Sequence, residues 1–209
     1  MSKTVLIEAQ YLPPIAYFAS LHGSQAIVVE KHEHFEKQTY RNRCYILGSS
    51  GTEMLIVPLT AKHGKTVISE VRIDYTQKWL NNHWRAIQSA YGKAPFFEYY
   101  SDDLCTVLFH NHVFLYDLNM ELLTLCLKWL KWSVPIRETT MFEKEVPEGV
   151  LDLRSAIKPK KAEPRDRFYQ PAVYHQVFGN KFVANLSLID LILCEGPGAR
   201  TIVHASALK

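Results

Sequence analysis

The N-terminal strand–helix–strand pattern is the feature that most constrains the fold. Val5–Glu8 and Gln25–Glu30 are short apolar runs of the kind that form buried strands. Between them, apolar residues repeat at helical spacing over residues 15–22, after Pro14, which suits a first helical turn, and before Gly23, which suits a helix end. A strand, a helix and a strand within about 30 residues form a βαβ unit, whose two strands are parallel. We therefore expect an open parallel sheet, which binds ligands beyond the carboxyl ends of its strands.

An antiparallel hairpin is expected next. Arg43–Leu47 and Met54–Leu59 flank the turn Gly48–Gly51, and two apolar runs around such a turn predict a β-hairpin. The alternating segment Val67–Ile73 is expected to extend this antiparallel sheet.

Three helices and a strand are predicted for the middle of the chain. Residues 77–91 place apolar side chains on one broad face, and a second helical stretch runs from Pro95 to about His110. Asp117 is a suitable cap for a third helix over residues 118–131. Val134–Arg137 then predicts a strand that returns to the sheet.

The most apolar stretch of the chain, Leu186–Cys194, predicts a short buried helix. A helix that is apolar on every side is normally buried. Ser187 and Asp190 have the spacing of an N-cap and an acid in the first turn, and Gly196 suits the C-terminal end. The polar residues near its start, which must be satisfied internally or used in function, are Gln176, Asn185, Ser187 and Asp190.

Length and composition favour one compact domain over residues 1–209. At 209 residues and 47% hydrophobic content, the chain can bury a sizeable core. We expect the α/β (or α+β) class, with a mixed sheet that contains the βαβ unit and the hairpin and is packed by helices. The N-terminal residues do not resemble a signal peptide, and no apolar run is long enough for a membrane span. With four widely spaced cysteines, this predicts a cytoplasmic protein with reduced thiols.

An irregular basic loop is expected at about residues 151–168. It combines prolines with a cluster of Lys and Arg between residues 158 and 167. A platform for single-stranded nucleic acid would interleave aromatic with basic residues, and this loop does not. With a net charge of only +3, we expect no nucleic-acid partner, and the loop is interpreted as solvated or, alternatively, as an anion-binding lid.

The loop after the second predicted strand, residues 31–43, is the first candidate ligand loop. It mixes His, acidic, basic and aromatic residues and has almost no aliphatic side chain. Arg41 and Arg43 can each bind a carboxylate or phosphate through two hydrogen bonds. The alternative is a solvated loop or edge strand. His32 and His34 would share a strand face, but no third ligand is evident nearby, so we expect no metal site.

No sequence motif of a common catalytic or cofactor-binding site is present. The chain lacks GxGxxG, GxxxxGK[ST], GxSxG and HExxH, so we expect no cofactor. Cys44 is the cysteine to test as a nucleophile, although a buried structural thiol is the preferred interpretation. His83 lies within an apolar helical face, either as a hydrogen-bonded core residue or as an acid–base group. The turn at residues 62–65 carries cations that could meet an anionic ligand.

Taken together, these segments resemble the WbqC-like proteins. The matching stretches run in order from about residue 5 to residue 198: QYLPPIAYF, YRNR, MLIVPLTAKHGKTVISEVRI, WLNNHWRAIQSAYGKAPFFEYY, LYDLNMELL and AVYHQVFGNKFVANLSLIDLILCEG. The resemblance implies an association with bacterial O-antigen and other surface polysaccharides, and a transferase that attaches an aminoacyl or acyl group to a sugar.

The resemblance also implies site residues. The positions that match the family pattern are Gln10, Tyr11, Asn42, Arg43, His83, Tyr91, Asn119, Tyr174, Gln176, Asn185, Ser187 and Asp190. The chain departs from the pattern at Glu8-Ala9, where the family has QP, and around residues 30–32, where the family commonly has paired aspartates. If the family's activity needs those aspartates, either Glu30, Glu33 or His32 replaces them here, or this protein has another substrate.

The leading hypothesis is an enzyme that acts on a sugar-linked small molecule. His83 and Asp190 are the predicted acid–base residues. The predicted substrate-binding residues are Gln10, Tyr11, Arg41, Asn42, Arg43, Asn119, Tyr174, Gln176 and Asn185. The alternative is a non-catalytic binding or accessory subunit of a polysaccharide-assembly system. A homodimer is compatible with either hypothesis.

Overall fold

The computed structural model describes residues 4–60, 65–159 and 165–208. Part of the cationic turn at residues 62–65 and the centre of the basic cluster, residues 160–164, lie outside them. The strands are β1 Thr4–Glu8, β2 Ala26–Glu30, β3 Arg43–Gly48, β4 Gly51–Ile56, β5 Ile136–Glu138 and β6 Val150–Asp152. The α-helices are α1 Ile15–Ser20, α2 Trp79–Tyr91, α3 Phe97–Leu108, α4 Leu115–Trp129, α5 Leu188–Glu195 and α6 Ala199–Ala205. Three short 3-10 helices span Ile68–Glu70, Arg165–Arg167 and Gly196–Gly198.

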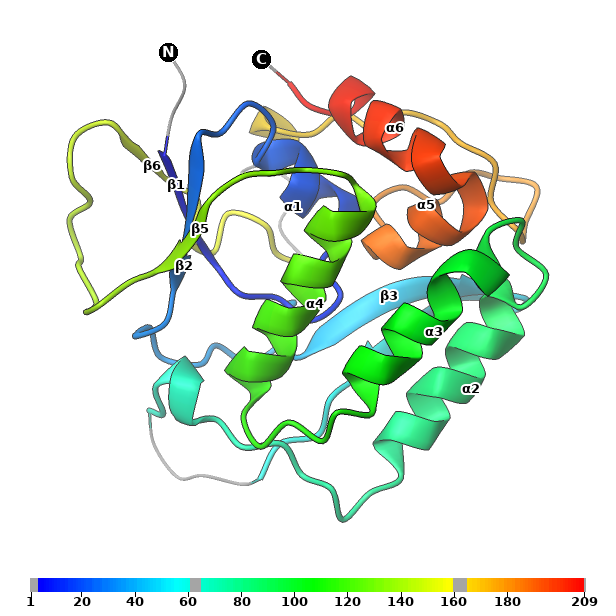
Figure 1. The fold of residues 1–209 in the computed structure, drawn as a ribbon, viewed down its shortest axis with the longest axis horizontal. Helices are drawn as coiled ribbons and strands as arrows, with labels where there is room; N and C mark the ends of the chain where they lie inside the picture. The colour runs from blue at the N-terminus through cyan, green and yellow to red at the C-terminus, as the bar shows by residue number, and fades with distance from the viewer. Residues whose placement is uncertain (1–3, 61–64, 160–164, 209) are drawn as a thin grey trace.

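A four-stranded parallel sheet confirms the predicted βαβ unit. Its strand order is β5-β2-β1-β6, and β1 pairs with β2 in the register Thr4 with Ala26 through Glu8 with Glu30. Val5 and Ile7 from β1, with Ile27 and Val29 from β2, face the core. Figure 1 shows the labelled helices on one side of this sheet, while the β5–β6 connection loops out on the other. Glu8 and Glu30 end neighbouring strands at the same edge, where an open sheet binds ligands.

The predicted hairpin is confirmed as a second, two-stranded sheet. β3 and β4 pair antiparallel around the turn that joins Gly48 and Gly51. The expectation that Val67–Ile73 forms a further strand was wrong, because Ile68–Glu70 is a 3-10 helix there. Isolated bridges, of Val67 with His34, of Arg72 with Phe114 and of Ile73 with Leu59, connect this segment to its neighbours instead of a continuous ladder.

The helices form where the apolar periodicity predicted them, but some of their ends differ from the predicted ones. α2 and α3 match the predicted segments within about two residues. α4 begins at Leu115 rather than residue 118, with Phe114 at its N-cap position, so Asp117 lies in the first turn instead of capping the helix. The strand β6 was missed, because three residues within a Pro-rich connection give no periodic signal. No helix of the described residues is both long and apolar enough to cross a membrane.

α5 is buried on all sides, as its sequence predicted. Its residues from Leu188 to Cys194 are all buried. Ser187 occupies the N-cap position, but its hydroxyl donates a hydrogen bond to the Leu12 carbonyl at 2.8 Å and makes no bond to the helix. Gly196 ends the helix with φ of 52°, and a Cβ there would lie 2.4 Å from the Phe96 ring. Glycine is therefore required at this position both by the backbone and by the close contact.

Candidate functional site

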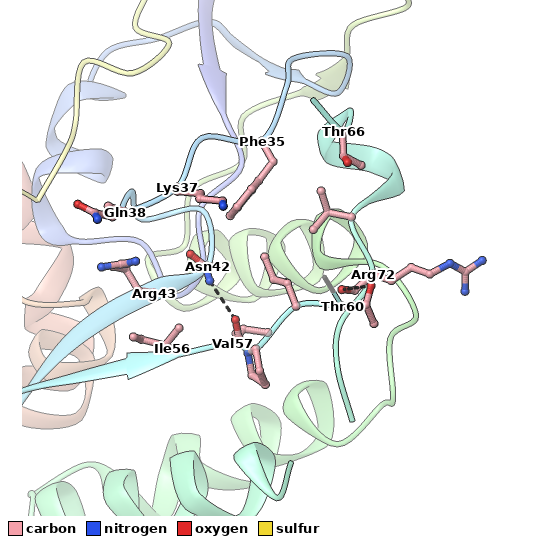
Figure 2. Close-up of a pocket in the computed structure, with 13 residues that line it drawn as sticks. Phe35, Lys37, Gln38, Asn42, Arg43, Ile56, Val57, Thr60, Thr66 and Arg72 are labelled. Carbon is pink, nitrogen blue, oxygen red and sulfur yellow. Dashed lines mark hydrogen bonds between the residues drawn. The ribbon is translucent and has the colours of Figure 1, made fainter. Parts of the chain in front are cut away.

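A pocket of about 630 Å³ lies where the loop after β2 meets the end of β4. We call it the Arg43 pocket. Its lining residues are Phe35, Lys37, Gln38, Asn42, Arg43, Ile56, Val57, Pro58, Leu59, Thr60, Thr66, Val71 and Arg72. Figure 2 shows Lys37, Gln38 and Arg43 together at one end, and Thr60 and Thr66 at the other.

The walls of this pocket are held by backbone hydrogen bonds between distant segments. Phe35 donates its N–H to the Thr66 carbonyl at 2.8 Å, and Thr60 donates to the Arg72 carbonyl at 3.0 Å. Val57 donates to the Asn42 carbonyl at 2.9 Å. Three chain segments are thus fixed around one cavity.

Asn42 presents a buried acceptor with no partner among the described residues. Its Nδ2 donates to the Val57 carbonyl at 3.0 Å, and a carbonyl can only accept, so this bond fixes which side-chain atom is nitrogen. The other atom, Oδ1, is buried and has no hydrogen-bond partner. Most buried polar atoms are hydrogen-bonded, so this oxygen is available to a ligand that donates.

Arg43 presents a buried donor in the same pocket. Its Nε is buried without a partner, and its Nη1 contacts only the Met54 sulfur at 3.6 Å, which is a weak acceptor. The described residues provide no carboxylate for this guanidinium. It is therefore free to bind an anion through a charge-assisted hydrogen bond.

The pocket is cationic and partly apolar. Lys37, Arg43 and Arg72 line it, and the described lining includes no Asp or Glu. Figure 2 shows Arg72 directed away from the other lining residues, which leaves Lys37 and Arg43 as the cations nearest the cavity. A ligand with both an anionic group and a hydroxyl or amine donor satisfies Arg43 and Asn42 together.

Arg41, predicted to bind substrate, instead makes a buried ion pair. Its Nε and Nη2 donate to the two carboxylate oxygens of Glu33 at 2.7 and 2.6 Å. Burial raises the pKa of Glu33, although the hydrogen bonds and charge of Arg41 oppose that shift. Asn119 is also buried and donates its Nδ2 to the Arg41 carbonyl at 2.8 Å. Both residues hold the turn that presents Asn42 and Arg43.

Tyr11 and His83 form a buried pair behind the pocket. His83 Nε2 lies 3.1 Å from the Ile56 carbonyl, which only accepts, so Nε2 carries the proton. His83 Nδ1 then accepts from the Tyr11 hydroxyl at 2.9 Å. Burial lowers the pKa of His83 to about 4, against an opposing hydrogen bond to Ile56. The pair holds Ile56, a lining residue, and keeps His83 neutral at physiological pH.

The lowered pKa predicts a pH-dependent loss of stability. His83 binds a proton near pH 6.5 in the unfolded state but only near pH 4 in the folded state. The stability contributed by neutral His83 is therefore complete above pH 6.5 and is lost as the pH falls through 4. Between pH 7 and pH 4, the free energy of unfolding should fall by about 3 kcal/mol more in the native protein than in His83→Gln. Urea unfolding at each pH measures it. An equal pH dependence in both proteins, with His175→Gln as an exposed control, would contradict the assignment.

Asp190 lies in a separate hydrogen-bonded group. The Tyr91 hydroxyl donates to its Oδ1 at 2.7 Å, and the Tyr174 hydroxyl to its Oδ2 at 2.5 Å. Gln176 Nε2 donates to Oδ2 at 3.3 Å, and the Tyr91 oxygen accepts the Leu47 N–H at 3.1 Å. Burial raises the pKa of Asp190, although these donors oppose the shift. This group joins α2, α5 and β3, and no member of it lines the Arg43 pocket.

Gln10 and Asn185 have local partners. Gln10 Nε2 donates to Glu8 at 2.7 Å and to the Ile157 carbonyl at 3.2 Å. Asn185 has φ of 58°, and its Oδ1 accepts the Ala16 N–H at 2.9 Å, at the start of α1. Neither lines the Arg43 pocket.

The acids considered as replacements for the family's aspartates lie at the carboxyl edge of the sheet and are paired. Glu30 accepts from Thr139 at 2.7 Å and from Arg154 at 3.0 Å, and Glu33 binds Arg41. His32 lies 3.1 Å from the Thr139 carbonyl. These contacts connect the ends of the strands to the loops that follow them.

The structure therefore brings only Asn42 and Arg43, among the predicted residues, into one pocket. No sequence pattern marks Lys37, Gln38, Thr60 or Thr66 as site residues, because they line the pocket only where three chain segments meet in space. Cys44 is fully buried, and burial raises the pKa of its thiol, as expected for the structural interpretation. All four cysteines are free.

Comparison with known proteins identifies a family and a relative of this chain. The family model described as WbqC-like protein family matches residues 8–163. The relative is "Uncharacterized protein Rv1507c" from Mycobacterium tuberculosis (strain ATCC 25618 / H37Rv), which is 29% identical over 153 residues. The match covers 71% of this chain and 64% of that protein. No solved structure matches.

Proposed function

The chain belongs to the WbqC-like protein family, and on that premise we propose that the Arg43 pocket binds an anionic, sugar-linked substrate. The proposed activity is transfer of an aminoacyl or acyl group to that sugar, in bacterial surface-polysaccharide biosynthesis in the cytoplasm. The family resemblance supports a sugar-linked substrate, and the cationic lining of the pocket supports an anionic one.

The observation that carries the proposal is the pair of unsatisfied buried atoms in one pocket. Arg43 Nε needs an acceptor and Asn42 Oδ1 needs a donor. A sugar phosphate or a sugar carboxylate supplies the acceptor through its anionic group and the donor through a hydroxyl or amine. The apolar side chains of Ile56, Pro58 and Leu59 provide a surface for the carbon face of a sugar ring.

In the proposed transferase, the chain acts mainly by binding and orientation. Arg43 would hold the anionic group, and Asn42 would fix a hydroxyl or amine of the same sugar. Positioning of two reactants can itself lower a barrier by several kcal/mol, on the order of 7–11 at best. The acid–base roles of His83 and Asp190 stay predictions. His83 is bonded to the carbonyl of the lining residue Ile56, and Asp190 to two tyrosine hydroxyls outside the pocket, so we propose that both residues position other groups.

A non-catalytic binding subunit is the second candidate, and one observation favours it. The described residues that line the pocket include no His, Cys, Asp or Glu. Such a lining can bind an anion but offers no evident proton acceptor or nucleophile. Product formation separates the two candidates. If a hexosamine phosphate binds but mass spectrometry finds no acylated product with an acyl thioester donor, the binding subunit is favoured.

Binding is tested by calorimetric titration with glucose 1-phosphate, glucosamine 1-phosphate and glucuronate, and with neutral glucose as the uncharged control. Arg43→Ala should weaken binding of the anionic sugars by about tenfold to a hundredfold, because it removes a charge-assisted hydrogen bond. Arg85→Ala removes the same charge from an exposed position on α2 and should leave the affinity unchanged.

Asn42 provides a second, independent variant. Asn42→Ala should weaken binding of the sugar phosphates more than binding of inorganic phosphate, because the oxygen that it removes is proposed to accept from the sugar. Equal affinities in the native protein, Arg43→Ala and Arg85→Ala would rule out the proposed site. A thermal melt of each variant establishes that it is folded.

A further inference from the structure

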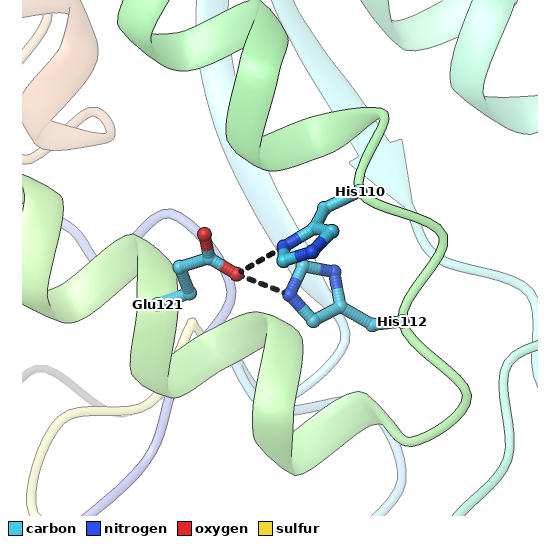
Figure 3. Close-up of side chains that lie close together, drawn as sticks. All are labelled: His110, His112 and Glu121. Atoms are coloured by element: carbon cyan, nitrogen blue, oxygen red, sulfur yellow. Dashed lines mark hydrogen bonds and ion pairs between the residues drawn. The ribbon is translucent and has the colours of Figure 1, made fainter.

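Two histidines and a glutamate converge between α3 and α4, outside the Arg43 pocket. His110 and His112 belong to the connection between these helices, and Glu121 to the second turn of α4. One ligand atom from each residue lies within 4.8 Å of the others. Glu121 Oε2 is 3.1 Å from His110 Nδ1 and 2.5 Å from His112 Nε2. Figure 3 shows both rings directed at this single oxygen.

The local backbone explains why both rings face the same side. Asn111, between the two histidines, has φ of 57°, a left-handed conformation that asparagine tolerates better than most residues. The Tyr75 hydroxyl donates to the His112 carbonyl at 2.8 Å and fixes the loop. The His112 side chain is only 9% exposed, whereas that of His110 is 69% exposed. One ligand is thus held in place, and another is free to adjust.

The donor set fits a borderline divalent cation. Two imidazoles and one carboxylate form a known zinc ligand set, with the fourth position open to water. Zinc–ligand distances of about 2.0–2.2 Å place tetrahedral ligand atoms about 3.3 Å apart. His110 Nδ1 and Glu121 Oε2 are nearly at that separation, and His112 Nε2 must move less than about 1 Å from the oxygen. Two imidazole ligands make Mg²⁺ and Ca²⁺ poor candidates, because these ions prefer oxygen ligands.

We propose that His110 Nδ1, His112 Nε2 and Glu121 bind one Zn²⁺ ion. The ion would cross-link the loop to α4 in place of the present hydrogen bonds. It would also brace one wall of the Arg43 pocket, because Leu115 donates to the Val71 carbonyl at 2.9 Å and Ile73 donates to the Val113 carbonyl at 3.1 Å. Val71 lines that pocket. The proposal does not depend on the proposed function.

The test uses the full chain without a histidine tag, first stripped of metal with a chelator. Calorimetric titration with ZnCl₂ should show one ion bound per chain, and zinc should raise the thermal midpoint. Glu121→Gln and His110→Ala should each weaken zinc binding at least about tenfold, since each removes one ligand of three. MgCl₂ should not bind. His175→Ala removes an exposed histidine elsewhere and should leave zinc binding unchanged.

Cobalt substitution gives a second readout. Co²⁺ bound in a four-coordinate site should show strong visible absorption that is lost in Glu121→Gln. His112 is largely buried, so His112→Ala is interpreted only if it remains folded, and the other two variants decide the question without it. Zinc binding that Glu121→Gln and His110→Ala leave unchanged would overturn the proposal, as would an absence of saturable binding. In that case the three residues serve only as a hydrogen-bonded brace.

Discussion

Replacing Arg41 with methionine is expected to lower the free energy of unfolding by about 3–5 kcal/mol. The side chain of Arg41 is only 1% exposed, and its guanidinium binds both oxygens of Glu33. Removing the cation leaves the Glu33 carboxylate buried without its charge partner, which costs more than the pair itself contributes. Urea unfolding followed by tryptophan fluorescence measures the loss.

The double variant separates the ion pair from general damage. Glu33→Leu combined with Arg41→Met removes both charges and should recover much of the lost stability, since an apolar pair of similar volume is often as stable as a buried ion pair. Arg85→Ala, on the exposed face of α2, should change stability by less than about 0.5 kcal/mol. If the double variant loses as much free energy of unfolding as Glu33→Leu and Arg41→Met lose in total, the two residues do not stabilise each other as a pair.

The pH dependence of Arg41→Met has a defined sign. Burial raises the pKa of Glu33 in the native protein, and loss of Arg41 should raise that pKa further. An acid whose folded-state pKa is raised favours folding at low pH and loses that contribution as the pH rises. The variant should therefore be closest to the native protein at low pH and furthest from it above neutrality.

Replacing Asp190 with alanine is expected to lower the free energy of unfolding by a comparable amount, about 3–5 kcal/mol, because two buried hydroxyls lose their acceptor. Tyr91 and Tyr174 both donate to this carboxylate, and Asp190 itself has no exposed surface. Alanine would leave both hydroxyls without an acceptor and a void beside α5. Each buried group left unsatisfied costs about 1–3 kcal/mol, and the void adds to that cost.

Two variants calibrate this effect. Tyr174→Phe removes one donor and leaves the carboxylate with its others, so it should cost about 1.5–3 kcal/mol. Asp102→Ala removes an exposed aspartate of α3 and should be nearly neutral. If Asp190→Ala unfolds at the same urea concentration as the native protein, Asp190 does not organise this part of the core.

The parts of the fold that the sequence predicted are those determined by local pattern. The βαβ unit, the hairpin around Gly48 and the buried helix ending at Gly196 each depend on apolar spacing and turn residues that lie within one short stretch. Val67–Ile73 has the same alternation as a strand, but its neighbours offer only single bridges, so it forms a 3-10 turn. Strand β6 gains its pairing from β1 and has no signal of its own.

The candidate site, too, could be predicted from the sequence only where local pattern determines it. The sequence grouped Arg41, Asn42 and Arg43 as ligand-binding residues, and the pocket contains the last two. The direction of Arg41 could not be predicted, because it depends on Glu33 lying opposite it in space. His83 and Asp190 were selected as polar residues in apolar surroundings, which fits a buried structural partner as well as a site residue. Periodicity does not distinguish the two.

The most direct test of the central claim is the NMR signal of the Arg43 side-chain Nε–H, assigned by its absence in Arg43→Lys. Titration with glucosamine 1-phosphate should shift this signal with a saturable dependence on concentration, while the Nε–H signal of exposed Arg85 stays in place. Neutral glucose, which has no anionic group, is expected to cause no such shift. If glucosamine 1-phosphate, glucose 1-phosphate and glucuronate all leave the Arg43 signal unmoved, the Arg43 pocket is not an anionic-sugar site.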